Sequence, residues 1–524
     1  MQCGFLCLED LLEENLNFKI KDFMKELKQN TKNSKIIELF GIDLRTLALF
    51  RILISLLIIF DIIFLRMSDI TAFYSDSGVL PRVLHIDLYK NWYASLYLIN
   101  GEPIFILFLF LITIFLAFLL LIGFQTKIAT FSLWIFMLSL HSRNPLVLTG
   151  GDTILHLLLF WSIFLPLGAR FSIDSTKSNY QKLPNRFFSI ASIAILLQVA
   201  FVYFFTAVCK ICPEWLNGTA LYYALNIDQY ATQFAILTRE HLDLMKVLSF
   251  IAYTIEFIGP ILLFSPILTT PIKLLTIFSF FCLQLGIGFC LKVGIFPFST
   301  TVGILLFLPS FFWDKVLINL TNLKLVQKAY MFLRAVLNKL SSLLTNQNLS
   351  FPNISYLAWV KNIFLIFCLS LIFLWNIQST GRTKIKLPEP LQRVSYFLGL
   401  EQGWVMFGPK TLKDDFWYVY LATLKNGKKI DLFTGAKKVS WEKPKKLLSS
   451  MYKNHRWITY YRNLWVSDKR LHPFLGQYLC REWNTKHKGN EIAEIEFYYF
   501  RENILPNNKK LPIVSGLMYK HTCY

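Results

Sequence analysis

The sequence predicts an all-α polytopic membrane helical bundle of about eight to nine spans, followed by a C-terminal α+β domain that is rich in strands. One observation is the composition, because 54% of the 524 residues are hydrophobic and 16% are aromatic. Another is that the apolar residues gather in runs, and about 20 such residues can cross about 30 Å of hydrocarbon as a helix. The runs lie at 46–66, 104–123, 128–141, 153–168, 187–208, 247–266, 272–291, 294–312 and 358–376. The third and fourth runs are short, so we expect them to be buried inside the bundle or to follow a re-entrant path.

Residues 1–42 precede the first run. Leucine and phenylalanine recur there at helical spacing with lysines between them, which predicts an amphipathic cytoplasmic helix and no cleavable signal peptide. Such a helix either lies on the membrane surface or is solvated, and the sequence leaves both open.

Residues 43–376 form the predicted transmembrane domain, and its basic loops predict its orientation. The loops at 169–186 and 313–357 carry several lysines and arginines each, whereas the alternate loops are longer or poorer in positive charge. With nine spans, both basic loops and the N-terminus fall on the cytoplasmic side. Residues 377–524 are then expected outside the cytoplasm, in a periplasm or a lumen.

The segment 377–524 is the predicted extracytoplasmic domain, and its strands are visible as alternating patterns. The stretch "FWYVYLATLKNGKKIDLF" (416–433) alternates on both sides of Asn426 and Gly427, which predicts a β-hairpin. The stretch "EIAEIEFYYF" (491–500) alternates as well. Between them, "HRWITYYRNLW" and "RLHPFLGQYLCREWN" predict helices.

Most of the net charge of +21 lies in this C-terminal domain, which holds 26 lysines and arginines against 12 aspartates and glutamates. Such a surface favours anionic partners, either membrane lipid headgroups or an acidic protein. No recognition motif for nucleic acid accompanies the charge, so we expect no nucleic-acid partner. The domain shows no spaced metal ligands. Cys480 and Cys523 can pair if the compartment is oxidising, and the sequence leaves this open.

The stretch "FFTAVCKICPEW" (204–215) ends the fifth run with Lys210 between Cys209 and Cys212. A thiol redox pair is the less favoured interpretation, because a helix C-terminus opposes a thiolate and Pro213 stops the helix there. Lys210 either snorkels to the interface or, if it is partly desolvated, supplies an amine that acts as a base.

Other polar residues in or near the spans are candidates too. Glu256, in "YTIEFIGP", is a carboxylate at membrane depth that is either functional or a structural hydrogen-bonding group. Arg143 and Asn144 are expected in a turn at the outer face, where they either hold an anionic headgroup or fix the loop.

The segment "VYFFTAVCKICPEW" resembles the stretch of vitamin K-dependent gamma-carboxylases that holds their catalytic lysine. Further segments are similar to the HTTM membrane domain that is shared with those carboxylases: "DLRTLALFRILIS", "FYSDSGVLPR", "HSRNPLVLTGGD", "LGARFSID", "EFIGPILLF", "VGIFPFSTTVGILLFLPSFFWD" and "WVMFGP". The resemblance covers residues 43–314, and the shorter tail resembles that of bacterial HTTM proteins.

The resemblance implies a reaction. In the carboxylases, the lysine deprotonates reduced vitamin K, oxygen adds, and a proton is removed from a glutamate side chain that then captures carbon dioxide. Lys210 falls on that lysine. A reduced vitamin K or related quinol is therefore the implied cofactor, and a glutamate-bearing protein or peptide is the implied substrate. Scarce water at the membrane boundary would suit this lyase chemistry.

The chain departs from the carboxylase pattern at two positions. Gly151 stands where the carboxylases carry a histidine, and the next residue, Asp152, either partners Lys210 or caps the fourth helix. Gln284 replaces a second histidine. The predicted catalytic set is thus Lys210, Asp152 and Glu256, and the predicted cofactor-binding set is Arg143, Asn144 and Gln284.

Two functions from different classes remain open at this point. One is a carboxylase-like membrane enzyme, for which Lys210 and Asp152 should converge on one cavity. The alternative is a non-catalytic membrane protein that binds lipid or quinone and whose outer domain docks a partner.

Overall fold

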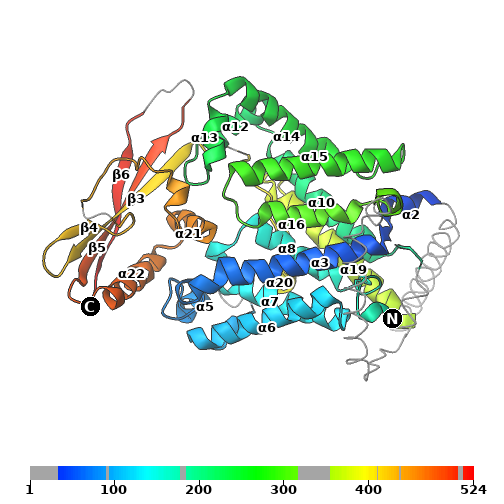
Figure 1. Cartoon of the computed structure of the whole chain (residues 1–524), viewed down its shortest axis with the longest axis horizontal. Coiled ribbons are helices and arrows are strands. Elements are labelled where there is room, and N and C mark those ends of the chain that lie inside the picture. Colours follow the sequence, from blue (N-terminus) through cyan, green and yellow to red (C-terminus); the bar gives the residue numbers. More distant parts are fainter. Residues whose placement is uncertain are drawn as a thin grey trace, which may run out of the picture.

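The computed structural model describes residues 34–89, 94–176, 184–316, 355–409, 411–435, 438–505 and 511–523. The molecule is elongated, with a helical bundle along most of its length and a β-sheet at one end (Figure 1). Helix α2 (Ser34–Phe40) lies at the opposite end of the bundle. We call these two ends of the bundle the sheet end and the α2 end. The predicted N-terminal helix within 1–42 falls mostly outside the described residues.

Six helices of the described chain are long and apolar enough to cross a membrane. The first is the continuous run Leu44–Phe73, in which α3 (Leu44–Phe60) continues through η1 (Asp61–Arg66) and η2 (Met67–Asp69) into α4 (Ile70–Phe73). The other five are α6 (Pro103–Ile122), α10 (Ile190–Cys209), α14 (Leu242–Leu262), α15 (Thr269–Cys290) and α19 (Ser355–Ser379). These helices indicate a multi-pass membrane protein.

Three predicted spans form shorter helices among the long ones: α7 (Thr126–Arg143), α8 (Gly150–Ser162) and α16 (Phe296–Ile304). Helix α8 is buried along almost its whole length. At 1.5 Å per residue such a helix is too short to cross the hydrocarbon layer by itself. The predicted count of eight to nine spans is therefore not confirmed, whereas the expected burial of the short fourth run is.

Short elements complete the two ends of the bundle. At the α2 end, β1 (Ile42–Asp43) pairs with β2 (Arg186–Phe187). The described helices of the loops at the sheet end are α5 (Arg82–Tyr89), α11 (Pro213–Leu216), α12 (Ala220–Leu225) and α13 (Gln233–Arg239).

The C-terminal sheet is antiparallel with the strand order β4-β3-β5-β6. Its strands are β3 (Asp414–Leu424), β4 (Lys429–Asp431), β5 (Ile492–Asn503) and β6 (Val514–Thr522). The β3–β4 pairing confirms the predicted hairpin, and Gly427 takes the positive φ of +80° that its turn requires. Strand β5 and the helices α21 (His455–Val466) and α22 (His472–Lys486) are also where the sequence predicts them. Strand β6 was not expected.

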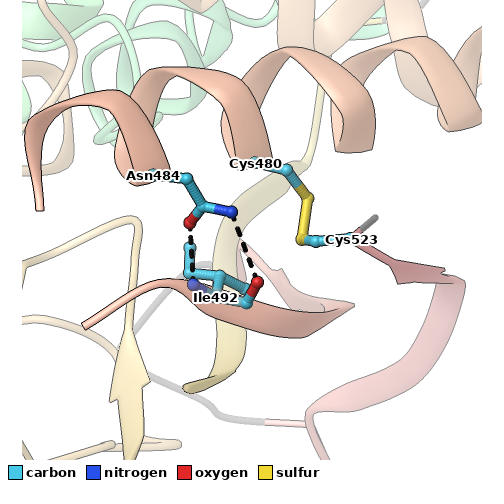
Figure 2. Close-up of a disulfide and its surroundings, with 4 residues drawn as sticks. All are labelled: Cys480, Asn484, Ile492 and Cys523. Carbon is cyan, nitrogen blue, oxygen red and sulfur yellow. Dashed lines mark hydrogen bonds between the residues drawn. A yellow bond between two sulfur atoms is a disulfide. The ribbon is translucent and has the colours of Figure 1, made fainter. Parts of the chain in front are cut away.

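A disulfide between Cys480 and Cys523 ties α22 to the residue after β6 (Figure 2). Beside it, Asn484 bonds both the backbone N–H and the carbonyl of Ile492, at the start of β5. The Cys480–Cys523 disulfide, which the sequence left open, is thus formed. It links the edge of the sheet at β6 to α22.

Between α19 and β3 the chain returns into the bundle. Helix α20 (Glu389–Leu398) ends at Gly399, whose carbonyl lies 2.7 Å from Nε2 of His156 in α8. Gln402 then accepts a hydrogen bond of 2.9 Å from Gln198 in the middle of α10. Residues 389–409 lie within the predicted C-terminal domain, and these contacts are with the helical bundle.

Candidate functional site

Lys210 is the C-terminal cap of α10, at the sheet end of the bundle. The helix stops there because Pro213 begins the next short helix and cannot continue an interior turn. Arg382 donates hydrogen bonds to the carbonyls of Val208 and Ile211, at 3.1 and 2.6 Å. A cation at this position satisfies carbonyls that a helix end leaves free, so the turn that carries Lys210 is held in place.

Lys210 forms a buried ion pair with Glu256 of α14. Its Nζ lies 2.6 Å from Oε2 of Glu256, and the two residues are 5% and 4% exposed. The Trp215 ring lies 4.2 Å from the same ammonium and adds a cation–π contact. Burying two charges away from water costs free energy, even when the charges pair with each other. The buried ion pair is therefore a candidate for a functional role.

The motif "WVMFGP" packs directly on this turn. Trp215 donates from Nε1 to the carbonyl of Phe407 at 2.8 Å. A Cβ at Gly408 would meet the carbonyl oxygen of Cys209 at 2.7 Å, so only glycine fits there. Two stretches that the sequence separates by about 190 residues therefore meet at Lys210.

A row of aromatic rings runs beside the ion pair. The ring of Tyr253 lies 6.4 Å from Trp215 and 6.1 Å from Phe257, and Phe257 lies 6.2 Å from Phe204. The last two contacts are stacked, with interplanar angles of 13° and 22°. Phe257 is 37% exposed, so the row borders the outside of the bundle. Glu256 lies between Tyr253 and Phe257 in the sequence of α14.

Gln284 contacts the same helix as Lys210. Its Nε2 donates to the hydroxyl of Tyr203 at 3.1 Å, and its Oε1 is buried without a partner in the described structure. Tyr203 lies seven residues before Lys210, so the two share one face of α10. Gln284 is therefore on the Lys210 side of the bundle, about two helical turns deeper.

Asp152 has different partners from Lys210. Its Oδ2 accepts hydrogen bonds from the backbone N–H and the hydroxyl of Thr149, at 2.8 and 2.9 Å, which makes it the capping-box residue of α8. Its Oδ1 lies 2.5 Å from Arg66 and 3.1 Å from Arg456. Of the two roles considered for Asp152, the structure shows the cap, and no contact with Lys210 among the described residues.

Asp61, Arg66, Asp152 and Arg456 form a closed group that we call the buried quartet. Arg66 lies 2.6 Å from Asp61, and Arg456 lies 2.5 Å from Asp61. All four side chains are fully buried. Asp61 and Arg66 bound a π-helical turn that interrupts the first span, and Arg456 enters from α21 of the C-terminal domain. The quartet thus joins that domain to the bundle.

Arg143 and Asn144 are fully buried and fix a loop. Arg143 donates to the carbonyls of Leu80 and Ser75, at 2.9 and 3.3 Å. Asn144 donates to the carbonyl of Phe73 at 2.9 Å. Both side chains therefore hold the "FYSDSGVL" loop, and they share no contact with Lys210 in the described chain.

Cys209 and Cys212 are both free thiols in buried surroundings. Burial raises the pKa of the Cys212 thiol, which opposes the thiolate that redox chemistry needs. The described residues contain no group of three or more His, Cys, Asp or Glu side chains arranged to hold a metal ion.

Sequence reasoning missed Trp215, Arg382 and the two arginines of the quartet. The signal for Arg66 was present, because an arginine inside an apolar run needs a partner. No comparable signal marks Arg456, which lies in a polar helix of a basic domain.

A family model described as the HTTM domain matches residues 41–312. No curated protein and no solved structure matches the chain.

Proposed function

Because the chain belongs to the HTTM domain family, we propose that it is a membrane enzyme in which Lys210 acts as a base on a lipophilic quinol. The quinol reaction is coupled to the carboxylation of glutamate side chains, as in the carboxylases that the chain resembles. The observation that carries the proposal is the buried Lys210–Glu256 pair at the end of α10.

The pair supplies a means of making a free amine. Oε2 of Glu256 lies 2.6 Å from Nζ of Lys210, so it is placed to accept the proton that Lys210 must release before its amine acts as a base. The amine then accepts a proton from a ligand hydroxyl. Glu256 is thus the partner of Lys210, a role for which the sequence had suggested Asp152.

The surroundings suit a flat, apolar substrate. The aromatic row of Trp215, Tyr253, Phe257 and Phe204 offers ring faces beside Lys210, and rings pack against such faces in offset or edge-on geometries. A reduced vitamin K or related quinol would supply the acidic hydroxyl and the reducing equivalents. The row is also where a ligand dissolved in the membrane would arrive.

We place the sheet end outside the cytoplasm. The Cys480–Cys523 disulfide supports this, because such bonds persist in oxidising compartments. The described part of loop 169–186 and the α2 segment lie at the opposite end (Figure 1). A reporter that is active only in the cytoplasm, fused after residue 520, should give no signal. A signal from it would mean that the orientation is the opposite of the proposed one.

The decisive experiment measures quinol-dependent incorporation of carbon dioxide into a glutamate-rich peptide by the full chain in liposomes. We expect activity in the wild type and none in Lys210→Met, which removes the base. Lys210→Arg should also be inactive, because arginine does not release its proton at accessible pH. Glu256→Gln should lower the rate by about 10²–10⁴-fold, the usual size of an acid–base contribution.

Two variants serve as matched controls. Lys273→Met removes another buried lysine of a spanning helix, 4% exposed, whose partners are the carbonyls of Glu38 and Leu39 at the α2 end. Replacement of Cys209 and Cys212 by serine tests the thiols. Both controls should keep the activity, and its loss in the serine variant would favour thiol chemistry.

The second candidate is a binding protein without catalysis. The charges of Lys210 and Glu256 compensate each other, so the pair is stable without a ligand, and this favours the second candidate. Wild-type protein that binds quinones but incorporates no carbon dioxide, across several quinols and peptides, would decide for this candidate.

A further inference from the structure

An exposed basic turn connects α19 to α20. It comprises residues Gly381–Lys386, all of which are exposed, and its cations are Arg382, Lys384 and Lys386. The function proposed above does not use these charges.

The turn is held at both ends. The backbone N–H of Leu387 donates to Oε1 of Gln378 at 2.6 Å, and Leu387 itself is buried. On the other side, the N–H of Arg382 donates to the hydroxyl of Thr380 at 3.2 Å. Gly381 takes a φ of +64° with open space around it, so the chain can reverse sharply there. Lys384 and Lys386 therefore lie on a turn whose two ends are fixed by hydrogen bonds.

The turn lies against the segment that carries Lys210. Arg382 is bonded to the carbonyls of Val208 and Ile211, which flank Lys210 in the sequence. Charges on the turn therefore lie next to the candidate site, at the same end of the bundle.

These charges are not neutralised within the described part of the chain, where no carboxylate forms an ion pair with Arg382, Lys384 or Lys386. Two acidic residues that are close in sequence or structure are already engaged. Glu389 pairs with Arg393 at 2.5 Å, and Glu214 pairs with Lys413 at 2.7 Å. Three exposed cations within five residues therefore lack a carboxylate partner in the described chain, where the guanidinium of Arg382 is bonded only to carbonyls.

We propose that this basic turn binds an acidic segment of a polypeptide and holds it beside Lys210. The proposal rests on the proposed function, because it gives the base a supply of carboxylate side chains. Three positive charges within five residues complement the closely spaced carboxylates of an acidic segment. Arg382 ties the turn to α10 and so directs the bound segment to the site.

The test is direct binding, which needs no catalysis. A labelled peptide of about ten glutamates is titrated against the full chain in phosphatidylcholine nanodiscs, and binding is followed by fluorescence anisotropy. Charge reversal of the turn, Lys384→Glu with Lys386→Glu, should weaken binding about tenfold. Neither side chain has a structural partner among the described residues, so folding should be preserved. Binding should also weaken as the salt concentration rises.

The matched control reverses two exposed lysines on the β3–β4 hairpin, Lys428→Glu with Lys429→Glu. It changes the net charge equally and should leave peptide affinity within about twofold. Equal loss in both variants would overturn the proposal, because the effect would then be one of net charge. Unchanged peptide binding in the turn variant would also overturn the proposal. In a parallel measurement in nanodiscs that contain phosphatidylglycerol, lost enrichment of this lipid around the variant would then assign the turn to lipid.

Lys210→Met separates this proposal from the proposed function. It should bind the peptide as the wild type does, because it leaves the turn intact. Peptide binding that depends on the turn, in a protein that never incorporates carbon dioxide, would uphold the docking surface and reject the enzyme.

Discussion

The buried quartet and the Lys210–Glu256 pair are both ionic groups inside the bundle, and they differ in how fully they are bonded. In the quartet, Asp152 accepts from two arginines and from the N–H and hydroxyl of Thr149. Among the described residues, Lys210 makes one side-chain hydrogen bond, to Glu256, with its three N–H donors, and its ammonium also contacts the ring of Trp215.

This difference separates a structural role from a chemical one. The dense bonding of the quartet favours one rigid arrangement, although Nε of Arg456 is buried without a partner among the described residues. A pair with spare donors at the edge of the bundle keeps capacity for a ligand. Burial alone therefore does not identify the site, since the quartet is the more buried of the two.

The largest effect should come from breaking the quartet. Replacing Arg456 by methionine leaves Asp61 and Asp152 with Arg66 as their shared cation. We expect the free energy of unfolding to fall by about 3–5 kcal/mol, the usual cost of leaving a buried charge uncompensated. Denaturant titration of the full chain in detergent would measure this.

Arg470→Met is the control for that experiment. Arg470 is 54% exposed and pairs with Asp87 and Asp468, so its replacement should change the free energy of unfolding far less than that of Arg456. Equal losses in the two variants would mean that the quartet is no stronger than a surface pair.

The candidate site should respond differently to the same treatment. Lys210→Met should lower the free energy of unfolding by roughly 2–3 kcal/mol, because Glu256 loses its cation. Adding Glu256→Met should recover most of that loss, since removing both partners leaves no polar group unpaired. A double variant that is as unstable as the sum of the singles would show that this pair, like the quartet, is structural.

A third ionic group connects the C-terminal domain to the segment between α12 and α13, and it differs from the other two because it is partly open to water. Lys443 is 28% exposed, and its Nζ lies 2.8 Å from Asp415, 2.9 Å from Asp228 and 3.0 Å from Glu502. Burial raises the pKa of Asp415 to about 6 from its ordinary value of 3.8, against the opposing effect of Lys443.

The folded chain thus holds the Asp415 proton more tightly than the unfolded chain does. Its contribution to stability is present below pH 3.8 and is lost as the pH rises to about 6. Asp415→Asn removes this titration, so between about pH 4.5 and about pH 7 the variant should gain about 2 kcal/mol relative to the wild type. Other titrating groups, such as His455, cancel in the difference. A difference that does not change with pH would contradict the raised pKa.

The apolar runs predicted most of the helices because a span needs an unbroken stretch of about 20 residues, and that is local information. The hairpin at Asn426 and Gly427 was predicted for the same reason, since its turn chemistry lies within a few residues. Lys210 was named from its place at the end of the fifth run and from the resemblance, and Glu256 was named from its depth in a run. Their pairing was not predicted, because the two residues are 46 positions apart on different helices.

The features that the sequence did not predict depend on contacts between distant segments. Strand β6 has weak alternation of its own and is defined by pairing with β5. The return of residues 389–409 into the bundle depends on Gln198 and His156, which lie more than 200 positions earlier. Asp152 could be read as a cap or as a partner of Lys210, and only the position of Arg456 shows where its second oxygen is used.

The bond between Arg456 and Asp61 also sets an order of events during synthesis, because 395 positions separate the two residues. At about 5–20 residues per second, the ribosome makes Arg456 roughly 20–80 s after Asp61. Until then Asp61, Asp152 and Arg66 carry one uncompensated negative charge inside the nascent bundle. The first apolar segment, which carries Asp61 and Arg66, and the fourth, which directly follows Asp152, should therefore reach their final packing only after the C-terminal domain emerges. A chain that stops before Arg456 should be retained by chaperones or degraded, even though the six described helices that are long enough to cross a membrane have already been made.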